Sequence, residues 1–488
     1  MSSVSRIIKS TALNLGGLGL PMIVAFFSIP YLIQMLGAEK FGLLALIWAV
    51  VSYVGIFDLG LGRALTLQVA TCDAQERRHE LGSILGTAYV LMLLLGGALA
   101  GVIFLAAPSI VALIKGVSDI REVEAAFIVM ALSVPFIILT SGFKGLLEAR
   151  QEFAKVNYVR LPLGIFTFAG PAILVFWFGA RLDLIAIVLV IGRVIGCLAY
   201  FWFALGIARI EHRQLSWRNA QVRQLCVCGG WLSVGSVVSP IMGYADRFVL
   251  GILVSANAVA YYVTPNELVT KLWILPGALT AVLFPIFSGY FVGGAKKNAV
   301  ELFDFFSMVI YLAVAPVSLV LAMFSYDLLQ FWVGSEFARE GQHVLVIFAF
   351  AILVNCLAHV PLTLLQGTGS AKSVAVLQLI EVPLFLLALW VLTLKFGVVG
   401  AAWAWVLRAL FDTAVMLKFA TLKLEVSYWP RAVTALLGVL GLVLIYWIIE
   451  GGALLTRIFF SGLVCLAFAV VILRLFFKAS AFKLKIQR

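Results

Sequence analysis

The chain consists mostly of uninterrupted apolar runs, each about as long as a lipid bilayer is thick. Residues 15–36 and 84–107, for example, contain no charged side chain. A helix that crosses the roughly 30 Å bilayer core needs about 20 such residues. Lipid offers the backbone no hydrogen bonds, so only helices and closed barrels can span it. A barrel would alternate apolar and polar positions in segments of about ten residues. These runs are continuous, and they therefore predict transmembrane helices.

About fourteen such helices are predicted, with short polar segments between them. The predicted spans are 15–36, 41–62, 84–107, 125–143, 159–179, 184–208, 225–254, 258–291, 303–326, 343–366, 374–395, 397–420, 431–449 and 456–477. The runs 225–254 and 258–291 exceed the bilayer thickness. We expect them to tilt, protrude or bend at Pro240, Pro265 or Pro276.

Composition agrees with this pattern and excludes a soluble fold. Of the 488 residues, 63% are hydrophobic and 12% are charged. A soluble domain carries about 25% charged residues because its surface meets water. The first apolar run is too long for a signal peptide, so we expect it to remain as the first span. The sequence thus predicts an all-α integral membrane protein.

The distribution of basic residues predicts the orientation of the chain. With the N-terminus in the cytoplasm, 24 of the 35 Lys and Arg residues fall in cytoplasmic segments. Basic residues concentrate on the cytoplasmic side of membrane proteins. Both termini are therefore expected in the cytoplasm. The net charge of +12 then reflects topology and contact with anionic membrane lipids rather than nucleic-acid binding.

Two halves of the chain resemble each other at an offset of 218 residues. LLEAR at 146–150 corresponds to LLQGT at 364–368, and the Phe-Gly pair at 178–179 corresponds to the pair at 396–397. Such an offset covers six spans, and an even number preserves orientation. We therefore predict six-helix bundles at 1–210 and 211–424, followed by two additional helices and a basic tail at 425–488.

Several segments resemble the polysaccharide flippases of the MOP superfamily. The similar segments are RIIKSTALNLGGLGLPMIVAFFSIPYLIQMLGAEKFGLLAL at 6–46, FDLGLGRALTLQVA at 57–70, YADRFVLGILVSANAVAYYVTPNELVTKLWILP at 244–276 and GVVGAAWAWVLR at 397–408. The resemblance is one of pattern, because none of these segments is a catalytic signature. It implies two bundles around a central cavity that opens alternately to either side of the membrane.

The resemblance also implies the cargo, an undecaprenyl pyrophosphate-linked oligosaccharide for O-antigen, capsule or exopolysaccharide assembly. A glycan polymerase and other assembly proteins would then be partners. Two relatives of the superfamily remain as alternatives, lipid II flippases and multidrug exporters. By analogy with lipid II flippases, the last two spans would supply a groove for the lipid tail.

Four basic residues lie away from the span ends and inside predicted spans, where a charge costs at least about 2.5–3.5 kcal/mol. They are Arg193, Arg247, Lys271 and Arg408. A guanidinium binds phosphate oxygens bidentately and keeps its charge when desolvated. We therefore predict that these four residues bind the pyrophosphate. The alternative for Lys271 and Arg408 is neutralisation by an acid four residues away, Glu267 or Asp412.

Four acidic residues are candidates for coupling or gating, namely Asp58, Asp246, Glu267 and Glu381. Asp58 precedes two glycines at the predicted end of a span, where a helix-end hydrogen bond or a pair with Arg63 is the alternative. Glu381 lies two residues before Pro383, and it is a candidate for exchanging a coupling proton or sodium ion.

Other chemistry is not indicated by the sequence. No P-loop is present, and neither catalytic residues, a metal site nor a cofactor is expected. The longest predicted outer loop, 108–124, is too short for the catalytic loop of a membrane glycosyltransferase, polymerase or ligase. Glycines within the spans, among them Gly96, Gly97 and Gly101, are expected to let helices approach closely.

Overall fold

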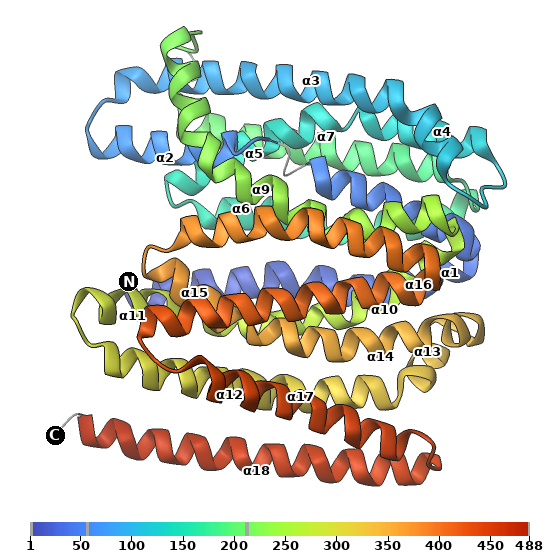
Figure 1. Cartoon of the computed structure of the whole chain (residues 1–488). Coiled ribbons are helices and arrows are strands. Elements are labelled where there is room, and N and C mark those ends of the chain that lie inside the picture. Colours follow the sequence, from blue (N-terminus) through green and yellow to red (C-terminus); the bar gives the residue numbers. More distant parts are fainter. Residues whose placement is uncertain (1–2, 55–57, 210–213, 487–488) are drawn as a thin grey trace. The chain divides into compact units, whose positions relative to one another are not determined.

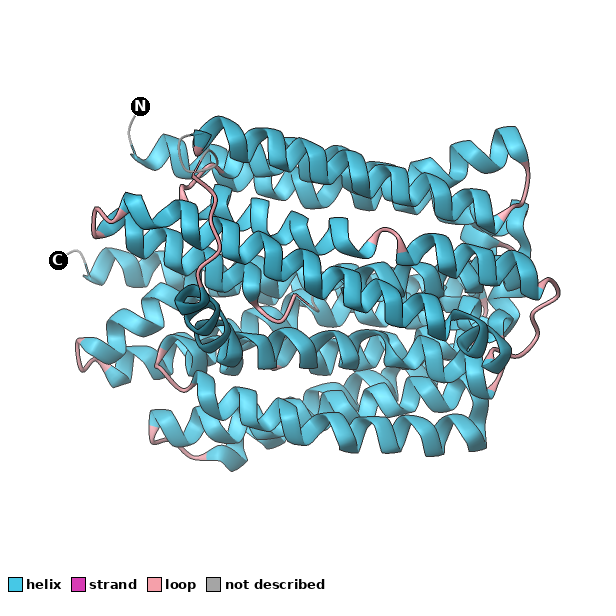
Figure 2. Ribbon diagram, turned by 90° about the horizontal axis from the view of Figure 1, so that it is seen from above, coloured by secondary structure: helices cyan, strands magenta, loops and turns pink. Residues whose placement is uncertain are grey.

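Helices make up nearly all of the computed structural model, and no strand occurs in the residues that it describes (Figure 2). Those residues are 3–54, 58–209 and 214–486. Within them, the side chains of 3–18, 51–54, 226–240 and 475–486, and of the single positions 78, 220, 224, 281, 292, 371 and 473, are not described. The predicted class, an all-α integral membrane protein, is confirmed.

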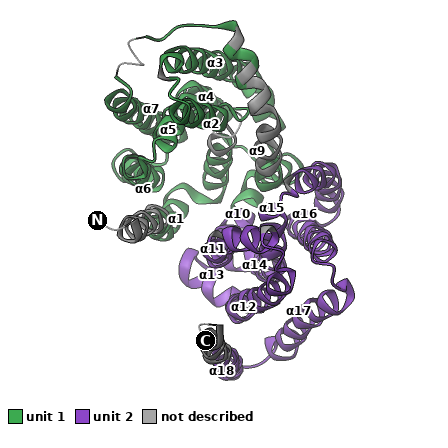
Figure 3. Ribbon diagram, turned by 90° about the vertical axis from the view of Figure 1, so that its left-hand side faces the viewer, with its two compact units in different colours: residues 1–260 green, residues 261–488 purple. Residues whose placement is uncertain are grey.

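The chain divides into two compact units, residues 1–260 and 261–488 (Figure 3). The helices of the first unit, labelled in Figure 1, are α1 (Ser3–Val54), α2 (Leu61–Ala74), the short 3-10 helix η1 (Arg78–Glu80), α3 (Leu81–Leu113), α4 (Ile120–Ala131), α5 (Val134–Ala149), α6 (Phe153–Phe178), α7 (Leu182–Ile207) and α9 (Asn219–Leu253). A buried apolar core joins α2, α3, α5 and α7.

The second unit begins within α10 (Ala256–Thr270). It continues with the 3-10 helix η2 (Lys271–Trp273), α11 (Ile274–Val292), α12 (Lys296–Met323), α13 (Ser325–Val333), α14 (Ser335–Leu357), α15 (His359–Gly367), α16 (Ala371–Leu424), α17 (Tyr428–Glu450) and α18 (Leu454–Ile486). The last two helices, drawn in red in Figure 1, pack against α12.

Eleven helical segments in the described part are long and apolar enough to cross a membrane. Two of them, Gly19–Val50 and Lys372–Leu424, each contain two helices, because the backbone turns at Gly37 (φ 74°) and Gly397 (φ 58°). Glycine adopts positive φ without steric cost. The 35-residue α9 is a further helix of spanning length. Together these segments correspond to the fourteen predicted spans.

The predicted offset of 218 residues recurs in the backbone. Turn residues with positive φ occur in four pairs at this spacing: Glu76 and Gly294, Gly116 and Gly334, Gln151 and Gly369, Gly179 and Gly397. The same loops are therefore built the same way in both halves, which supports the internal repeat. The predicted boundary at residues 210 and 211 and the termini at 1–2 and 487–488 lie outside the described residues. The bundle limits and the orientation remain predictions.

The second predicted span is interrupted in the structure. It was expected to end at residue 62, but α1 ends at Val54 and a turn at 58–60 leads into α2. Leu59 (φ 49°) and Gly60 (φ 71°) turn the chain. The Asp58 carboxylate accepts hydrogen bonds from the backbone N–H groups of Gly60 (2.9 Å) and Gly62 (3.1 Å). These bonds satisfy donors that the first turn of a helix leaves unpaired.

The long span of residues 258–291 also has a break. The 3-10 helix η2 separates α10 from α11 there. Pro276 has no N–H group to donate to the carbonyl of Leu272, and its ring crowds that carbonyl. The bend predicted at Pro276 remains a prediction, and the side chain of Pro240 lies outside the described residues.

Neighbouring glycines of α3 differ in their surroundings. A Cβ atom on Gly96 would lie 2.7 Å from the backbone Cα of Pro135 in α5, whereas nothing lies within 4 Å of one on Gly97 or Gly101. The predicted role in close helix packing is therefore confirmed for Gly96 and is wrong for the other two.

We predict that Gly96→Ala lowers the thermal unfolding temperature of the detergent-solubilised protein by several degrees, because overpacking costs about 1–3 kcal/mol. The adjacent Gly97→Ala is the matched control. It should leave the temperature unchanged or raise it, since Ala is favoured over Gly in a helix by about 0.5–1 kcal/mol. Equal melting temperatures for the two variants would contradict this packing.

Candidate functional site

Arg247 of α9 is buried in the first unit and packs against an aromatic ring. Its side chain is 6% exposed, and the guanidinium carbon lies 4.8 Å from the centroid of the Tyr244 ring. The neighbouring Asp246, also buried, accepts a hydrogen bond of 2.8 Å from the backbone N–H of Arg247. A planar cation over an aromatic face is stabilised by the ring quadrupole and held in one orientation.

Arg193 lies on the side of α7 that packs against other helices. Leu189, Cys197 and Tyr200 are four or seven residues away from Arg193 and therefore lie on the same side of the helix, and all three are buried. Arg193 itself is half-buried, and within the described residues no hydrogen bond or ion pair is found for its guanidinium. A cation in such surroundings needs water or an anionic ligand, because lipid cannot solvate it.

Arg408 and Glu381 form an ion pair inside the second unit. The Nε atom of Arg408 lies 3.6 Å from Oε1 of Glu381, with side-chain exposures of 13% and 3%. The guanidinium also lies over the rings of Phe385 (5.4 Å) and Trp405 (5.5 Å). Among the residues that the structure describes, neither carboxylate oxygen of Glu381 has a hydrogen-bond partner. Glu381 therefore pairs across the turn at Gly397 with Arg408, for which the sequence had suggested Asp412 on the same helix.

The pair of Lys271 and Glu267 has the predicted spacing along the helix. Lys271 donates a hydrogen bond of 2.8 Å to the Glu267 carboxylate. The side chains are 37% and 24% exposed. Self-neutralisation, the simpler interpretation of these residues, is thus observed, although both groups remain accessible. Asp58 likewise makes the helix-end bonds that were the simpler interpretation of it.

The comparison with protein families identifies the family of this chain. Residues 7–291, more than half of the chain, match the family described as "Polysaccharide biosynthesis protein". The chain belongs to the polysaccharide biosynthesis protein family. The resemblance to a family of polysaccharide biosynthesis, predicted from the sequence, is thereby confirmed.

A curated relative supports membership of the polysaccharide biosynthesis protein family. The chain is 28% identical over 418 residues to a Shigella flexneri protein named "Putative O-antigen transporter". The match covers 84% of this chain and 96% of that protein. That relative is named as a transporter and not as an enzyme of polysaccharide synthesis.

Solved structures share the fold of this family member. An inward-facing multidrug resistance MATE family transporter of the MOP superfamily superposes with a TM-score of 0.74 at 12% identity, over 84% of this chain and 98% of that one. The lipid II flippase MurJ in an inward closed conformation gives 0.67 at 15% identity, over 96% of this chain and 99% of that one. At these identities the likeness concerns the fold alone.

The predicted charges divide between the two units of this family member. Arg193, Arg247, Asp246 and Asp58 belong to the first unit, and Lys271, Glu267, Arg408 and Glu381 to the second. Within the units, Arg408 meets Glu381, Lys271 meets Glu267, and the backbone N–H of Arg247 meets the Asp246 carboxylate.

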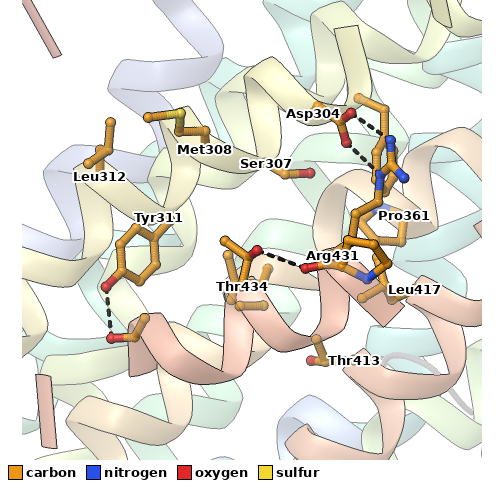
Figure 4. Close-up of a pocket in the computed structure, with 15 residues that line it drawn as sticks. Asp304, Ser307, Met308, Tyr311, Leu312, Pro361, Thr413, Leu417, Arg431 and Thr434 are labelled. Atoms are coloured by element: carbon orange, nitrogen blue, oxygen red, sulfur yellow. Dashed lines mark hydrogen bonds and ion pairs between the residues drawn. The ribbon is translucent and has the colours of Figure 1, made fainter. Parts of the chain in front are cut away.

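The second unit contains a cavity of about 610 Å³, and the sequence did not predict which residues line it. Its lining residues come from α12, α14 to α17 and are mostly apolar, as Figure 4 shows with Met308, Leu312 and Leu417. Arg431 of α17 and Asp304 of α12 form a bidentate ion pair at its edge, with two contacts of 2.7 Å. Asp304 and Arg431 each lie at the end of a predicted span, and this position was the indication that the sequence offered for the pair.

We predict that Arg408→Ala destabilises the protein by about 3–5 kcal/mol, because it leaves the Glu381 carboxylate buried without its cation. Thermal unfolding in detergent measures this change. The Glu381→Gln substitution in the same chain should restore much of the lost stability. Lys271→Ala is the control and should change stability by less than about 1 kcal/mol, since its pair is partly exposed. Additive losses in the double variant would contradict the pairing.

Proposed function

We propose that this protein flips an undecaprenyl pyrophosphate-linked oligosaccharide across the bacterial cytoplasmic membrane by alternating access. The glycan would serve O-antigen, capsule or exopolysaccharide assembly. The observation that carries this proposal is the Shigella flexneri relative, matched over 96% of its length and named as an O-antigen transporter. The fold supports it, because related transporters of the superfamily have solved inward-facing structures.

The buried arginines give the proposal its chemistry. Pyrophosphate carries more charge than lipid can accept, so its carrier must supply cations inside the membrane. Arg193 and Arg247 would bind the phosphate oxygens in the first unit, and Arg408 in the second, with Lys271 as a further contact for the cargo. Arg408 is well suited to exchange partners, since its contact with Glu381 is 3.6 Å long and is not a hydrogen bond.

A lipid II flippase is the second candidate. The specific observation in its favour is that the structural match to MurJ covers 96% of this chain, whereas the match to the multidrug transporter covers 84%. Lipid II is also a polyprenyl pyrophosphate carrying sugars, so both candidates require the same buried cations. A multidrug exporter of cations is opposed by a buried Arg247 and a half-buried Arg193.

The remaining expectations form part of the same proposal. The polyprenyl tail would occupy the apolar cavity beside α17, with the Arg431–Asp304 pair at its edge. Both termini would lie in the cytoplasm, and a glycan polymerase would receive the cargo. Glu381 would bind a coupling proton or sodium ion, because its carboxylate is buried and has no hydrogen bond.

The direct test is flipping of fluorescent lipid-linked oligosaccharide by the full-length protein in proteoliposomes. We predict that Arg193→Ala combined with Arg247→Ala lowers the rate at least tenfold, because hydrogen bonds to charged groups contribute about 1.5–3 kcal/mol each. Arg181→Ala is the control, since this arginine lies on a loop and its side chain is 58% exposed. An unchanged rate in the double variant would remove both arginines from the substrate site.

The role of Glu381 is tested by imposing a pH gradient and a sodium gradient on the same vesicles in turn. The wild-type rate should increase with one of the two gradients. In Glu381→Gln, which is isosteric and neutral, that increase should be lost while transport without a gradient continues. If Glu381→Gln responds to the gradient as the wild type does, the coupling site lies elsewhere.

A further inference from the structure

Trp273 stands at the midpoint of a membrane span. The span Ala256–Phe291 has 36 residues, and Trp273 is the eighteenth. Tryptophan is enriched at the two membrane interfaces, where its ring is partly apolar and partly wet. Trp273 lies far from both ends of this segment and is 38% exposed, a position that differs from that of an anchor at a span end.

The indole ring is held in a fixed orientation by the second unit. Its Nε1–H donates a hydrogen bond of 2.8 Å to the side-chain oxygen of Asn355 in α14, which is itself buried. The ring lies 6.4 Å from that of Trp405 at an angle of 33°. Trp405 is buried and packs against Phe348 and the Arg408 guanidinium. Trp273 is thus the accessible end of a rigid aromatic group that reaches the Arg408–Glu381 pair.

The helix tightens at Trp273. This residue belongs to η2, a 3-10 turn within an otherwise α-helical span. A stretch of 3-10 helix inside a longer helix often marks a functional hinge or a sequence under strain. The side chains of the adjacent pair Lys271 and Glu267 are 37% and 24% exposed. Exposed charges are unfavourable in lipid, so we infer that this part of the span faces a wet space.

We propose that Trp273 is a stacking surface for a pyranose ring of the cargo, with Lys271 and Glu267 as donor and acceptor for its hydroxyl groups. A pyranose has an apolar C–H face that fits an indole ring, and a polar rim that needs hydrogen bonds. A fixed aromatic ring offers large contact area at a low entropic cost. This inference rests on the proposed function, and it assigns the glycan, as distinct from the pyrophosphate, to η2.

Binding is tested without transport by fluorine NMR of the full-length protein in detergent, labelled with 5-fluorotryptophan. Trp273→Phe identifies the Trp273 resonance among the twelve tryptophans. The probes are undecaprenyl pyrophosphoryl N-acetylglucosamine and undecaprenyl pyrophosphate. Because stacking uses a C–H face common to pyranoses, the probe need not carry the natural glycan. The Trp273 resonance should shift with the glycosylated probe only.

Transport is then compared in proteoliposomes with fluorescent lipid-linked oligosaccharide. Trp273→Ala should lower the rate about tenfold, which corresponds to about 1.4 kcal/mol. Trp403→Ala is the matched control and should stay within about twofold of the wild type, since Trp403 is 48% exposed but lies outside this aromatic group.

The glycan site at Trp273 and the proposed function can be disproved independently of each other. No resonance shift with the glycosylated probe, or equal shifts with both probes, overturns the glycan site even if the wild type flips the lipid. A selective shift in a protein that flips no lipid-linked oligosaccharide upholds the glycan site and overturns the proposed function.

Discussion

The absence of hydrogen-bonding partners in the bilayer core is the constraint on which the structure depends. Backbone groups inside a membrane must be satisfied within the protein, which favours uninterrupted helices. Every departure from a helix is then costly and needs its own local support. The turn at Asp58 shows this. The buried Asp58 carboxylate accepts hydrogen bonds from two backbone N–H groups that the start of α2 leaves unpaired. Breaks in this chain are therefore informative about function.

The same constraint explains how charges are placed. A cation inside the membrane must be paired, stacked on an aromatic ring or in contact with water. Arg247 lies over Tyr244, and Arg408 lies over Phe385 and Trp405 beside Glu381. These arrangements hold the guanidinium groups in place while keeping them charged. A phosphate-bearing cargo would find cations that are already oriented, at little further cost in entropy.

The repeat relates the turns of the two halves but not the chemistry beside them. Four turn residues with positive φ in the first half have partners at the 218-residue offset in the second. The side chains differ, however, because Asp58 caps a helix in the first unit while Lys271, Glu267 and Trp273 remain accessible in the second. We interpret this as one ancestral backbone plan that carries different chemistry in each half.

The sequence by itself determined the helical class, the fourteen spans and the 218-residue repeat, because span length and apolar continuity follow from local composition. It also identified the buried charges, since a charge in an apolar run is conspicuous. Only the tertiary structure decided their partners. Arg408 meets Glu381 because the chain turns back at Gly397, and Trp273 meets Asn355 because η2 packs beside α14. Contacts between residues far apart in the chain depend on packing, and packing leaves little trace in the order of apolar and polar residues.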